Sequence, residues 1–187
     1  MSEESKSEES IGKREGWLKD VPGLDIRYTE PEDGKYLKEW LMDPSIGRWF
    51  PMFDQVEVDD AVMRWIGFSR YKCSLTAVLD GVPCGIATLY LQPYRKIAHQ
   101  CEFGIIVNGE QRGRGIGTQL INNLMHLAKN TFRIELLHLQ VYEGNPAVRL
   151  YKRCGFEEFG HQTHWIKETD KEGKPFFVGR VFMERFI

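Results

Sequence analysis

The alternation of hydrophobic and polar residues divides most of the chain into short strands and amphipathic helices. Residues 24–28 alternate as a strand with one buried face does, and two apolar stretches flank Asp80-Gly81-Val82-Pro83, a sequence typical of a hairpin turn. The pattern predicts seven strands, at residues 24–28, 74–79, 84–91, 100–107, 135–141, 159–167 and 176–186.

The first half of the chain also contains apolar residues at helical spacing. Thr29 and Glu32 have the spacing of a capping box, with Pro31 in the first turn, and predict a helix that ends near Met42. A second helix is predicted over residues 57–71. Both helices precede the hairpin, so the order of elements begins with one strand, two helices and a run of strands.

Two more helices are predicted in the second half of the chain. From Ile116 onward, apolar residues line one helical face and polar residues the other. Asn145 followed by Pro146 predicts the start of a short helix, and Gly155 followed by Phe156 predicts its C-cap. Seven strands and four helices in this order predict a single mixed α/β sheet.

The composition is that of one folded domain. The chain has 187 residues, of which 42% are hydrophobic, and we expect a flexible tail over residues 1–22 before a domain over 23–187. Lys and Arg number 25 against 27 Asp and Glu, and this net charge of −2 argues against a nucleic-acid partner. No stretch reaches the ~18 apolar residues of a membrane span, and the acidic start is unlike a secretory signal. We therefore expect a cytoplasmic protein.

The spacing of cysteines and histidines predicts neither disulfides nor a metal site. The four cysteines are widely scattered, at Cys73, Cys84, Cys101 and Cys154. They form no C-x-x-C pair, so we expect reduced thiols that pack as small hydrophobic residues. His161 and His164 lack the partners of a zinc-binding set, and no metal is expected.

The most informative segment joins the strand over 100–107 to the helix that starts at Ile116. It reads Gln111-Arg112-Gly113-Arg114-Gly115-Ile116-Gly117-Thr118. A helix start presents free N–H groups and the positive end of its dipole, and glycines let an anion approach that backbone closely. Arg112 and Arg114 add forked donors that suit phosphate oxygens. The segment therefore predicts a di- or polyphosphate ligand.

Two common phosphate-binding motifs do not fit this segment. A nucleotide-triphosphate loop needs a lysine before Thr118, and the dinucleotide fingerprint needs a different spacing from that of Gly113, Gly115 and Gly117. In an alternative interpretation, the glycines merely allow a strand and a helix to pack tightly, and the arginines are solvated.

Two segments of the chain resemble the GNAT superfamily of acyl-CoA N-acyltransferases. Residues 112–117 resemble its R-x-x-G-x-G acetyl-CoA loop. A second signature, N-x-x-A-x-x-L-Y-x-x-x-G-F, is similar to Asn145-Pro146-Ala147-Val148-Arg149-Leu150-Tyr151-Lys152-Arg153-Cys154-Gly155-Phe156. The spacing from Asn145 to Tyr151 is one residue shorter than the family pattern, so the role of Tyr151 transfers more directly. For Asn145, contact with the cofactor and a plain N-cap role are both open.

The resemblance implies an α+β fold with a mostly antiparallel sheet flanked by helices, and an acetyl-CoA site. It implies that two central strands splay apart, and that backbone groups of Ile105, Ile106 and Val107 hold the thioester and pantetheine. The pyrophosphate would be bound by backbone N–H groups of Arg112, Gly113, Arg114, Gly115, Ile116, Gly117 and Thr118. Tyr151 would donate a proton to the departing CoA thiolate; the alternative for Tyr151 is a packed aromatic ring.

Glu102 is the candidate general base. An amine must be neutral to attack, and a lysine-like amine with a pKa of roughly 10.4 is mostly protonated at pH 7, so a base is needed. Glu102 lies on the strand that leads into the glycine-rich loop, where alternation with Cys101 and Phe103 fixes the face of its side chain. The alternative is a solvated carboxylate on a strand.

The resemblance implies that the loop after the first helix and the last two strands shape the acceptor pocket. That loop is unusually aromatic, with Trp49, Phe50, Met52 and Phe53. Acidic residues follow it at Asp54, Glu57, Asp59 and Asp60. An aromatic lid with acids beside it would suit a cationic amine. In the alternative, the aromatic residues belong to the core and the acids stabilise the start of the second helix.

These features together predict an acetyl-CoA-dependent N-acetyltransferase that acts by direct transfer in a ternary complex. A small primary amine is the favoured acceptor, and a protein N-terminal amine, as in ribosomal-protein alanine acetyltransferases, is the alternative. A catalytically inactive acyl-CoA-binding module and another phosphate-ligand binder such as a nucleotide protein are rival interpretations. No nucleic-acid or membrane partner is expected, and a homodimer is compatible with the sequence.

Overall fold

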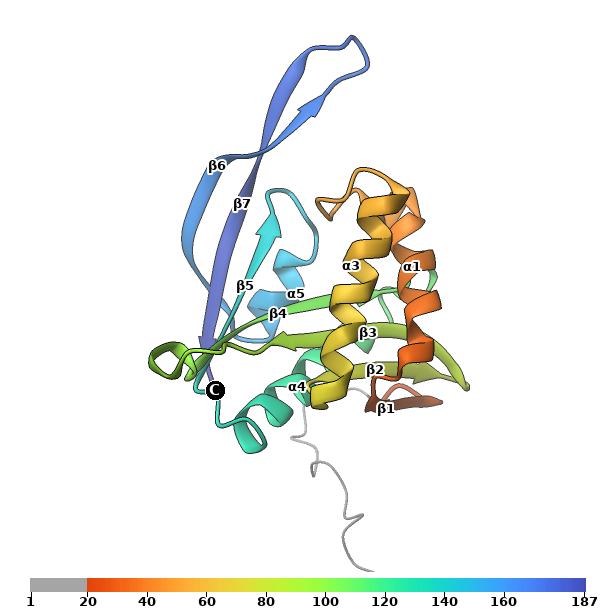
Figure 1. Ribbon diagram of the computed structural model, residues 1–187, viewed down its shortest axis with the longest axis vertical. Coiled ribbons are helices and arrows are strands. Elements are labelled where there is room, and N and C mark those ends of the chain that lie inside the picture. Colours follow the sequence, from red (N-terminus) through yellow and green to blue (C-terminus); the bar gives the residue numbers. More distant parts are fainter. Residues whose placement is uncertain (1–19) are drawn as a thin grey trace, which may run out of the picture.

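A single sheet of seven strands runs through the computed structural model, with helices on both faces (Figure 1). The structure describes residues 20–187, so most of the predicted tail over 1–22 lies outside it. The strands are β1 (Leu24–Tyr28), β2 (Ser74–Leu79), β3 (Val82–Tyr90), β4 (Gln100–Val107), β5 (Leu136–Tyr142), β6 (Glu157–Thr169) and β7 (Pro175–Phe186). The helices are α1 (Gly34–Met42), α2 (Pro44–Gly47), α3 (Gln55–Gly67), α4 (Ile116–Asn130) and α5 (Val148–Arg153). None of the helices within 20–187 has the length and apolar character needed to cross a bilayer.

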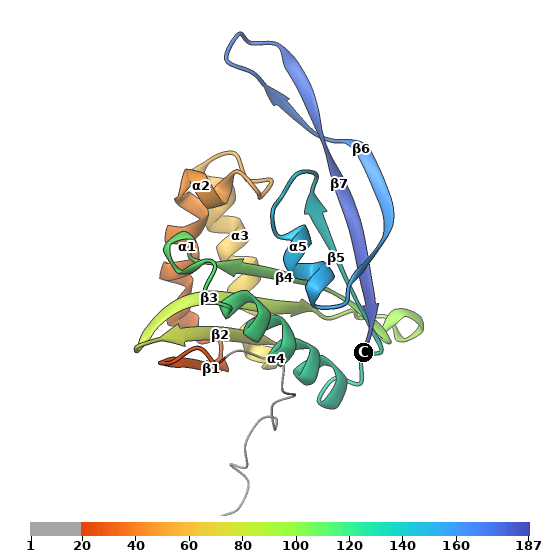
Figure 2. The ribbon, with the colours of Figure 1, turned by 180° about the vertical axis from the view of Figure 1, so that it is seen from behind.

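The strand order is β1-β2-β3-β4-β5-β7-β6. Every neighbouring pair is antiparallel except β4 and β5, which are parallel and are connected through α4. This confirms the predicted single mixed and mostly antiparallel sheet. β6 and β7 form a long hairpin that projects beyond the rest of the molecule (Figure 2).

The parallel pair β4 and β5 diverges along most of its length. The two strands pair only at Gln100–Glu102 with Leu136–His138. Beyond that point β4 stays paired with β3 as far as Val107, and β5 stays paired with β7 as far as Tyr142. One backbone edge of each strand therefore faces an opening in the middle of the sheet, where peptide groups lack a partner strand.

Two hydrophobic cores hold helices against opposite faces of the sheet. On one face, α4 buries Leu120, Ile121 and Leu124 fully. On the other face, side chains of α1 and α3 pack with Ile86 of β3 and Ile106 of β4. Because residues alternate along β4, Glu102 and Ile106 point toward the side of α1 and α3, whereas Phe103 belongs to the core beneath α4.

The first helix starts differently from the prediction. The predicted capping pair Thr29 and Glu32 is wrong, because the side chain of Thr29 is buried in a hydrogen bond with Ser74. The N–H of Glu30 instead donates to the carboxylate of Asp33 at 3.0 Å. A 3₁₀ turn follows, and α1 begins at Gly34. Asp33 takes this role because interactions with the sheet hold its side chain inward.

The segment after α1 is more helical than predicted. The aromatic loop predicted after the first helix, over residues 46–53, overlaps the short helix α2, which Asp43 caps by accepting the N–H of Ser45 at 2.8 Å. The helix predicted over 57–71 starts earlier, at Gln55, and changes to a 3₁₀ turn at Phe68. A capping side chain at the start of α2 and of α3 sets these boundaries. The spacing of apolar residues, on which the prediction relied, does not indicate where such a cap lies.

All four cysteines are buried and free, as predicted. Burial raises the pKa of the Cys73 and Cys84 thiols to about 11 and that of Cys101 to about 12. These thiols therefore stay protonated at neutral pH and pack as small apolar groups.

Candidate active site

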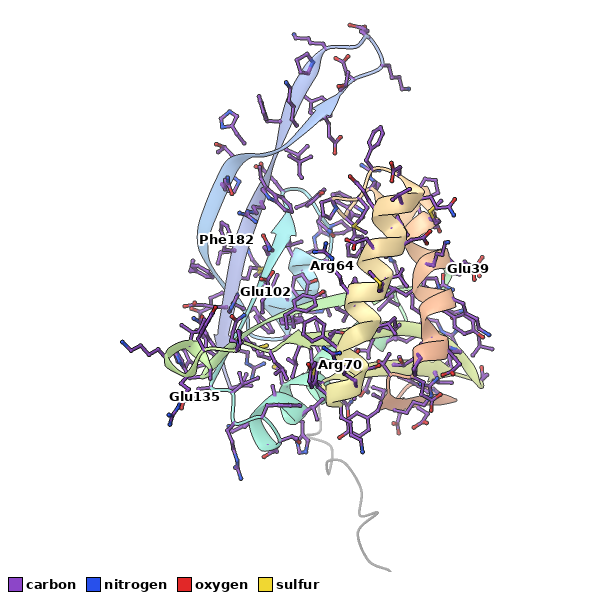
Figure 3. The ribbon with its side chains drawn as sticks, viewed as in Figure 1. Glu39, Arg64, Arg70, Glu102, Glu135 and Phe182 are labelled. Carbon is purple, nitrogen blue, oxygen red and sulfur yellow. The ribbon has the colours of Figure 1, made fainter. Side chains whose placement is uncertain are left out.

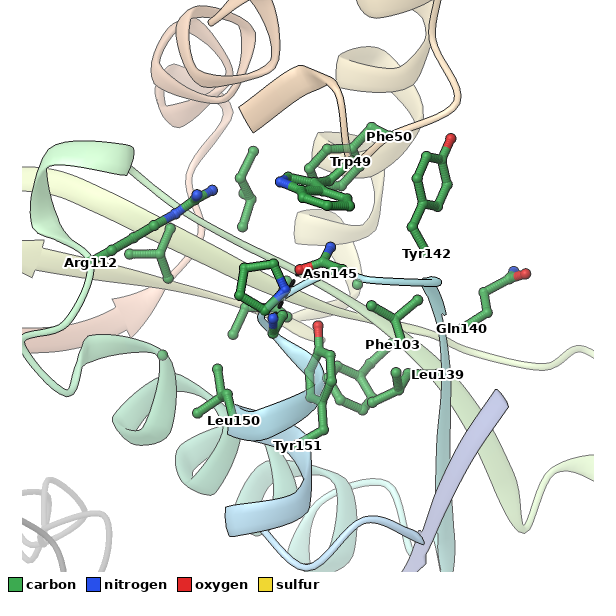
Figure 4. A pocket seen from close by; sticks show the side chains of 18 of the residues that line it. Trp49, Phe50, Phe103, Arg112, Leu139, Gln140, Tyr142, Asn145, Leu150 and Tyr151 are labelled. Atoms are coloured by element: carbon green, nitrogen blue, oxygen red, sulfur yellow. Dashed lines mark hydrogen bonds between the residues drawn. The ribbon is translucent and has the colours of Figure 1, made fainter. Parts of the chain in front are cut away.

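A cavity of about 1380 Å³ occupies the opening between β4 and β5 (Figure 4). One end is formed by the glycine-rich loop and the starts of α4 and α5, and the other by the segment before α3 and by the inner faces of α3, β5 and β6. All of the residues predicted for catalysis or cofactor binding line it: Glu102, Ile105, Ile106, Val107, Arg112, Gly113, Arg114, Gly115, Ile116, Gly117, Thr118, Asn145 and Tyr151. The role of each in ligand binding stays a prediction.

The loop requires glycine for two different structural reasons. Gly113 and Gly115 have φ of +76° and +92°, backbone that only glycine adopts without strain. Gly115 is the N-cap of α4. Gly117 lies in the helix, where a Cβ would come within 2.9 Å of Leu150 on α5. The first two glycines thus shape an anion-accessible turn, and the third lets α4 and α5 approach.

The loop end of the cavity is cationic. Arg112 and Arg114 belong to the loop and line it, and the side chain of Arg114 donates to Gln111 Oε1 at 2.5 Å. The first N–H groups of α4 lack intrahelical acceptors, as at every helix start, and the helix dipole adds positive potential there. The donor set of this end matches an anion with several phosphate oxygens.

Tyr151 is held in place by the end of α5. The N–H of Phe156 donates to the carbonyl of Tyr151 at 3.0 Å, and the N–H of Gly155 donates to that of Lys152, which is a Schellman motif with Gly155 at φ +78°. This confirms the predicted C-cap. The rings of Phe103 and Phe156 both lie 6.3 Å from the Tyr151 ring. Burial raises the pKa of Tyr151, so its hydroxyl stays protonated, and Figure 4 shows the hydroxyl pointing into the cavity toward Asn145.

Asn145 makes a hydrogen bond at the beginning of α5. Its Oδ1 accepts the N–H of Ala147 at 2.9 Å, and α5 itself begins at Val148, slightly later than Pro146 predicts. The carbonyl of Asn145 accepts the N–H of Val148 at 3.2 Å. The N-cap of α5 is Ala147 and has no side-chain capping hydrogen bond, so Asn145 stabilises the turn before the helix rather than capping it, and it also lines the cavity.

Glu102 lies where β4 and β5 begin to diverge. Its Oε1 accepts a hydrogen bond from Gln140 Nε2 at 2.8 Å, and its register partner on β3 is Tyr90. In the view of Figure 3, Glu102 lies between Phe182 on β7 and Arg64 on α3. Glu102 is the only carboxylate among the described residues that line the cavity.

Aromatic side chains enclose the end of the cavity near Glu102. Trp49, Phe50 and Met52 line it as predicted, whereas Phe53 is 95% exposed and points away. The Trp49 ring meets Tyr142 edge-on at 6.4 Å, and further aromatic side chains come from α3, β3 and β6. This end is therefore mostly apolar.

The acidic residues after the aromatic loop do not line the cavity. Asp54 caps α3 by accepting the N–H of Glu57 at 2.9 Å. Asp60 pairs with Arg64 at 2.8 Å, and Asp59 pairs with a lysine of α1 at 2.6 Å. The interpretation of these acids as part of an acceptor mouth is therefore wrong. They stabilise the start of α3 and its contact with α1.

Comparison with known protein families identifies the family of the chain that contains this cavity. Residues 31–156, which include both signature segments, match the model of the acetyltransferase (GNAT) family. The chain belongs to the GNAT family. It is accordingly an acetyl-CoA-dependent N-acetyltransferase.

Curated relatives and solved structures agree with this membership. The chain is 28% identical to the L-amino acid N-acetyltransferase AaaT of Escherichia coli over 57% of this chain and 67% of that protein. It is 38% identical to a spermidine N(1)-acetyltransferase of Vibrio cholerae, but over only 35% of this chain and 38% of that protein. An acetyltransferase of Salmonella typhimurium, solved with acetyl-CoA, has the same fold, with a TM-score of 0.66 at 17% identity over 88% of this chain and 94% of that one.

The GNAT site also contains residues that the sequence did not indicate. Tyr90, Gln140 and Trp165 line the cavity, and Arg180 contacts Gln140 from β7. They come from four strands spread over 90 residues of sequence, and no local motif marks them. Alternation along β5 places Gln140 on the face opposite the apolar Leu139, and this pattern was the only available signal.

Proposed function

We propose that this GNAT enzyme transfers the acetyl group of acetyl-CoA to a small primary amine that carries a single ammonium group. The transfer is direct, in a ternary complex, with Glu102 as the base and Tyr151 as the acid. The observation that carries the proposal is that one continuous cavity has a cationic anion-binding end and an aromatic end with one carboxylate.

The cationic end supports the binding of acetyl-CoA. Backbone N–H groups at the start of α4, with Arg112 and Arg114, would bind the pyrophosphate. The open edge of β4 at Ile105–Val107 offers peptide groups that can hydrogen-bond the amides of pantetheine, because β5 has already diverged there. Acetyl-CoA supplies an activated thioester, and the chain supplies its orientation.

Glu102 prepares the acceptor. Its carboxylate takes one proton from the ammonium group, directly or through water, and leaves a neutral amine with a free electron pair. The amine nitrogen then forms a C–N bond with the thioester carbonyl carbon while the π pair of the C=O bond moves onto its oxygen, and that pair re-forms the C=O bond when the C–S bond breaks. The second proton lost by the nitrogen passes to solvent.

Tyr151 assists departure of the thiolate. When the C–S bond breaks, its electron pair stays on sulfur, and the Tyr151 hydroxyl donates its proton to that sulfur. Tyr151 then regains a proton from water. The raised pKa of the buried phenol keeps the proton on Tyr151 until negative charge develops beside it.

The charges near Glu102 favour an acceptor with one positive charge. A polyamine carries several ammonium groups, each of which needs a carboxylate or a comparable acceptor when it leaves water. Among the described lining residues only Glu102 offers one, because Asp60 does not line the cavity and is already paired with Arg64. An amino-acid-like monoamine satisfies this site better, in agreement with the acceptor named for the Escherichia coli relative.

Release of CoA thiol measured across a panel of amines tests the proposal. L-amino acids and simple monoamines are expected to give higher kcat/KM than spermidine or a peptide with an N-terminal alanine. A preference for spermidine or for the peptide would overturn the acceptor assignment. Tight acetyl-CoA binding without thiol release for any amine would indicate a binding module.

The acid role has its own test. Tyr151→Phe removes one hydroxyl and is expected to lower kcat about 100-fold while the Kd for acetyl-CoA stays within about twofold. Tyr71→Phe is the matched control, because Tyr71 is 52% exposed and lies outside the cavity. Full activity of Tyr151→Phe would remove Tyr151 from the mechanism.

A further inference from the structure

We propose that Gln140 and Arg180 are positioning residues that hold the carboxylate of Glu102 in its working orientation. The inference rests on the proposed role of Glu102 as the base. It concerns residues on β5 and β7 that belong to neither signature segment.

The sheet register brings the three side chains together. Glu102 on β4 pairs with His138 on β5, and paired residues point to the same face, so Gln140 shares the face of Glu102. On the other side of β5, Tyr142 pairs with Arg180 of β7, which brings the guanidinium beside Gln140. The divergence of β4 from β5 leaves room for these long polar side chains.

The hydrogen bonds of this group run in a single direction. Arg180 donates through one terminal nitrogen to Gln140 Oε1 and through Nε to Gln162 Oε1 at 2.9 Å. Gln140 Nε2 donates to Glu102 Oε1 at 2.8 Å. A guanidinium only donates and an ionised carboxylate only accepts, so the amide of Gln140 has one orientation that satisfies both neighbours.

Arg180 is itself fixed by stacking. Its guanidinium carbon lies 4.6 Å from the ring centre of Trp165 and 4.7 Å from that of Phe182. Trp165 in turn meets the Tyr142 ring at 4.9 Å. A planar group in contact with two aromatic rings keeps few rotamers, so Arg180 presents its donors to Gln140 in a constant direction.

The two carboxylate oxygens of Glu102 therefore have different environments. Oε1 is occupied by Gln140. Oε2 has no hydrogen-bond partner among residues 20–187 and is available to the acceptor amine or to a water molecule. Without Gln140 the carboxylate is free to rotate, and a base displaced by about 1 Å loses up to about 100-fold in rate.

Gln140→Met tests this role, because it keeps the length of the side chain and removes both hydrogen bonds. We expect kcat to fall about tenfold, with KM for acetyl-CoA and the melting temperature unchanged. Gln55→Met is the matched control, since Gln55 is exposed, lies outside the cavity and is expected to keep wild-type kcat. Wild-type kcat in Gln140→Met would overturn the inference.

A double-mutant cycle with Glu102→Gln separates the positioning of Glu102 by Gln140 from a general structural effect. Glu102→Gln alone is expected to lower kcat about 100-fold, and adding Gln140→Met should then cause less than a twofold further loss, because no base remains to be positioned. A full tenfold further loss would overturn the positioning role while leaving Glu102 as the base. Wild-type activity of Glu102→Gln would overturn the assignment of Glu102 as the base, and with it the positioning role of Gln140 and Arg180.

The guanidinium fork of Arg180 is tested separately. Arg180→Lys keeps the charge but not the planar, stacked fork, and is expected to lose as much kcat as Arg180→Met. If the lysine variant kept wild-type kcat, charge alone would be sufficient, and the orientation argument for Arg180 would be wrong.

Discussion

Asp33 lies at the start of a chain of buried hydrogen bonds that ends at the wall of the active site. Its carboxylate accepts two hydrogen bonds from Arg27 at 2.8 Å and one from Thr76 at 2.8 Å. From Thr76 the chain continues through the hydroxyl groups of Thr29, Ser74 and Thr88. It ends at Trp65, whose Nε1 donates to Thr88 at 2.6 Å. Trp65 lines the cavity. We predict that Asp33→Ala destabilises the protein strongly.

The expected size follows from the burial of Asp33. The residue is 2% exposed, and its loss leaves the Thr76 hydroxyl and the Glu30 N–H without their acceptor. Removing one partner of a buried ion pair costs about 3–5 kcal/mol, and the lower end applies because the Arg27 side chain is 31% exposed and can regain water. A loss of about 3 kcal/mol corresponds to a melting temperature lower by roughly 6–12 °C in a chain of this length.

The effect depends on pH in a defined direction. Burial by itself would raise the pKa of Asp33, but the hydrogen bonds from Arg27, Glu30 and Thr76 outweigh it and hold that pKa below the usual 3.8. The ionised group therefore stabilises the fold fully above about pH 4, and this contribution is lost as the pH falls through the lowered folded pKa. The difference between wild type and Asp33→Ala should shrink below about pH 4.

Urea unfolding at pH 7 and at several lower pH values measures both effects. Asp59→Ala is the control, because Asp59 forms an ion pair whose side chains are 39% and 48% exposed, and pairs of this kind contribute about 0–1 kcal/mol. Equal losses for the two variants at pH 7, or a loss in Asp33→Ala that does not change with pH, would refute the reasoning.

Three further predictions concern the cavity and the thiols. In Gly104→Ala the new methyl group would overlap the hydroxyl of Tyr90, so kcat/KM should fall at least about tenfold at unchanged Kd for acetyl-CoA, whereas Gly67→Ala, with open space around it, should behave as wild type. Calorimetric titration of a variant with Arg112→Ala and Arg114→Ala should show acetyl-CoA binding weakened by about 10–100-fold, with less salt dependence than wild type, and unaltered binding would contradict the pyrophosphate assignment. Because burial raises the thiol pKa values, a thiol reagent at pH 8 should label the four cysteines slowly in the native enzyme and completely after unfolding; rapid native labelling would contradict their burial.

The parts of the site that the sequence predicted are those built from one continuous segment. The turn at Gly113 and Gly115 and the C-cap at Gly155 each depend on a glycine at positive φ. These requirements come from the local backbone, so a short segment of sequence is enough to reveal them. The divergence of β4 and β5 is different. It arises from pairing across the sheet, and only the family resemblance indicated it.

The misplaced acidic mouth shows why charge patterns near a site are poor evidence for its ligand. Asp54 and Asp60 are close in sequence to the aromatic residues of the cavity, yet the backbone of α3 and Arg64 already satisfy them. Glu102 is isolated in the sequence, and its partners Gln140 and Arg180 follow 38 and 78 residues later. A carboxylate acts on an acceptor only where helix ends and cations of the fold leave one of its oxygens available. In this enzyme the strand register brings Gln140 to one oxygen of Glu102 and leaves the other without a hydrogen-bond partner among residues 20–187. The charge at this end of the cavity therefore depends on a pairing that no local segment of the sequence contains.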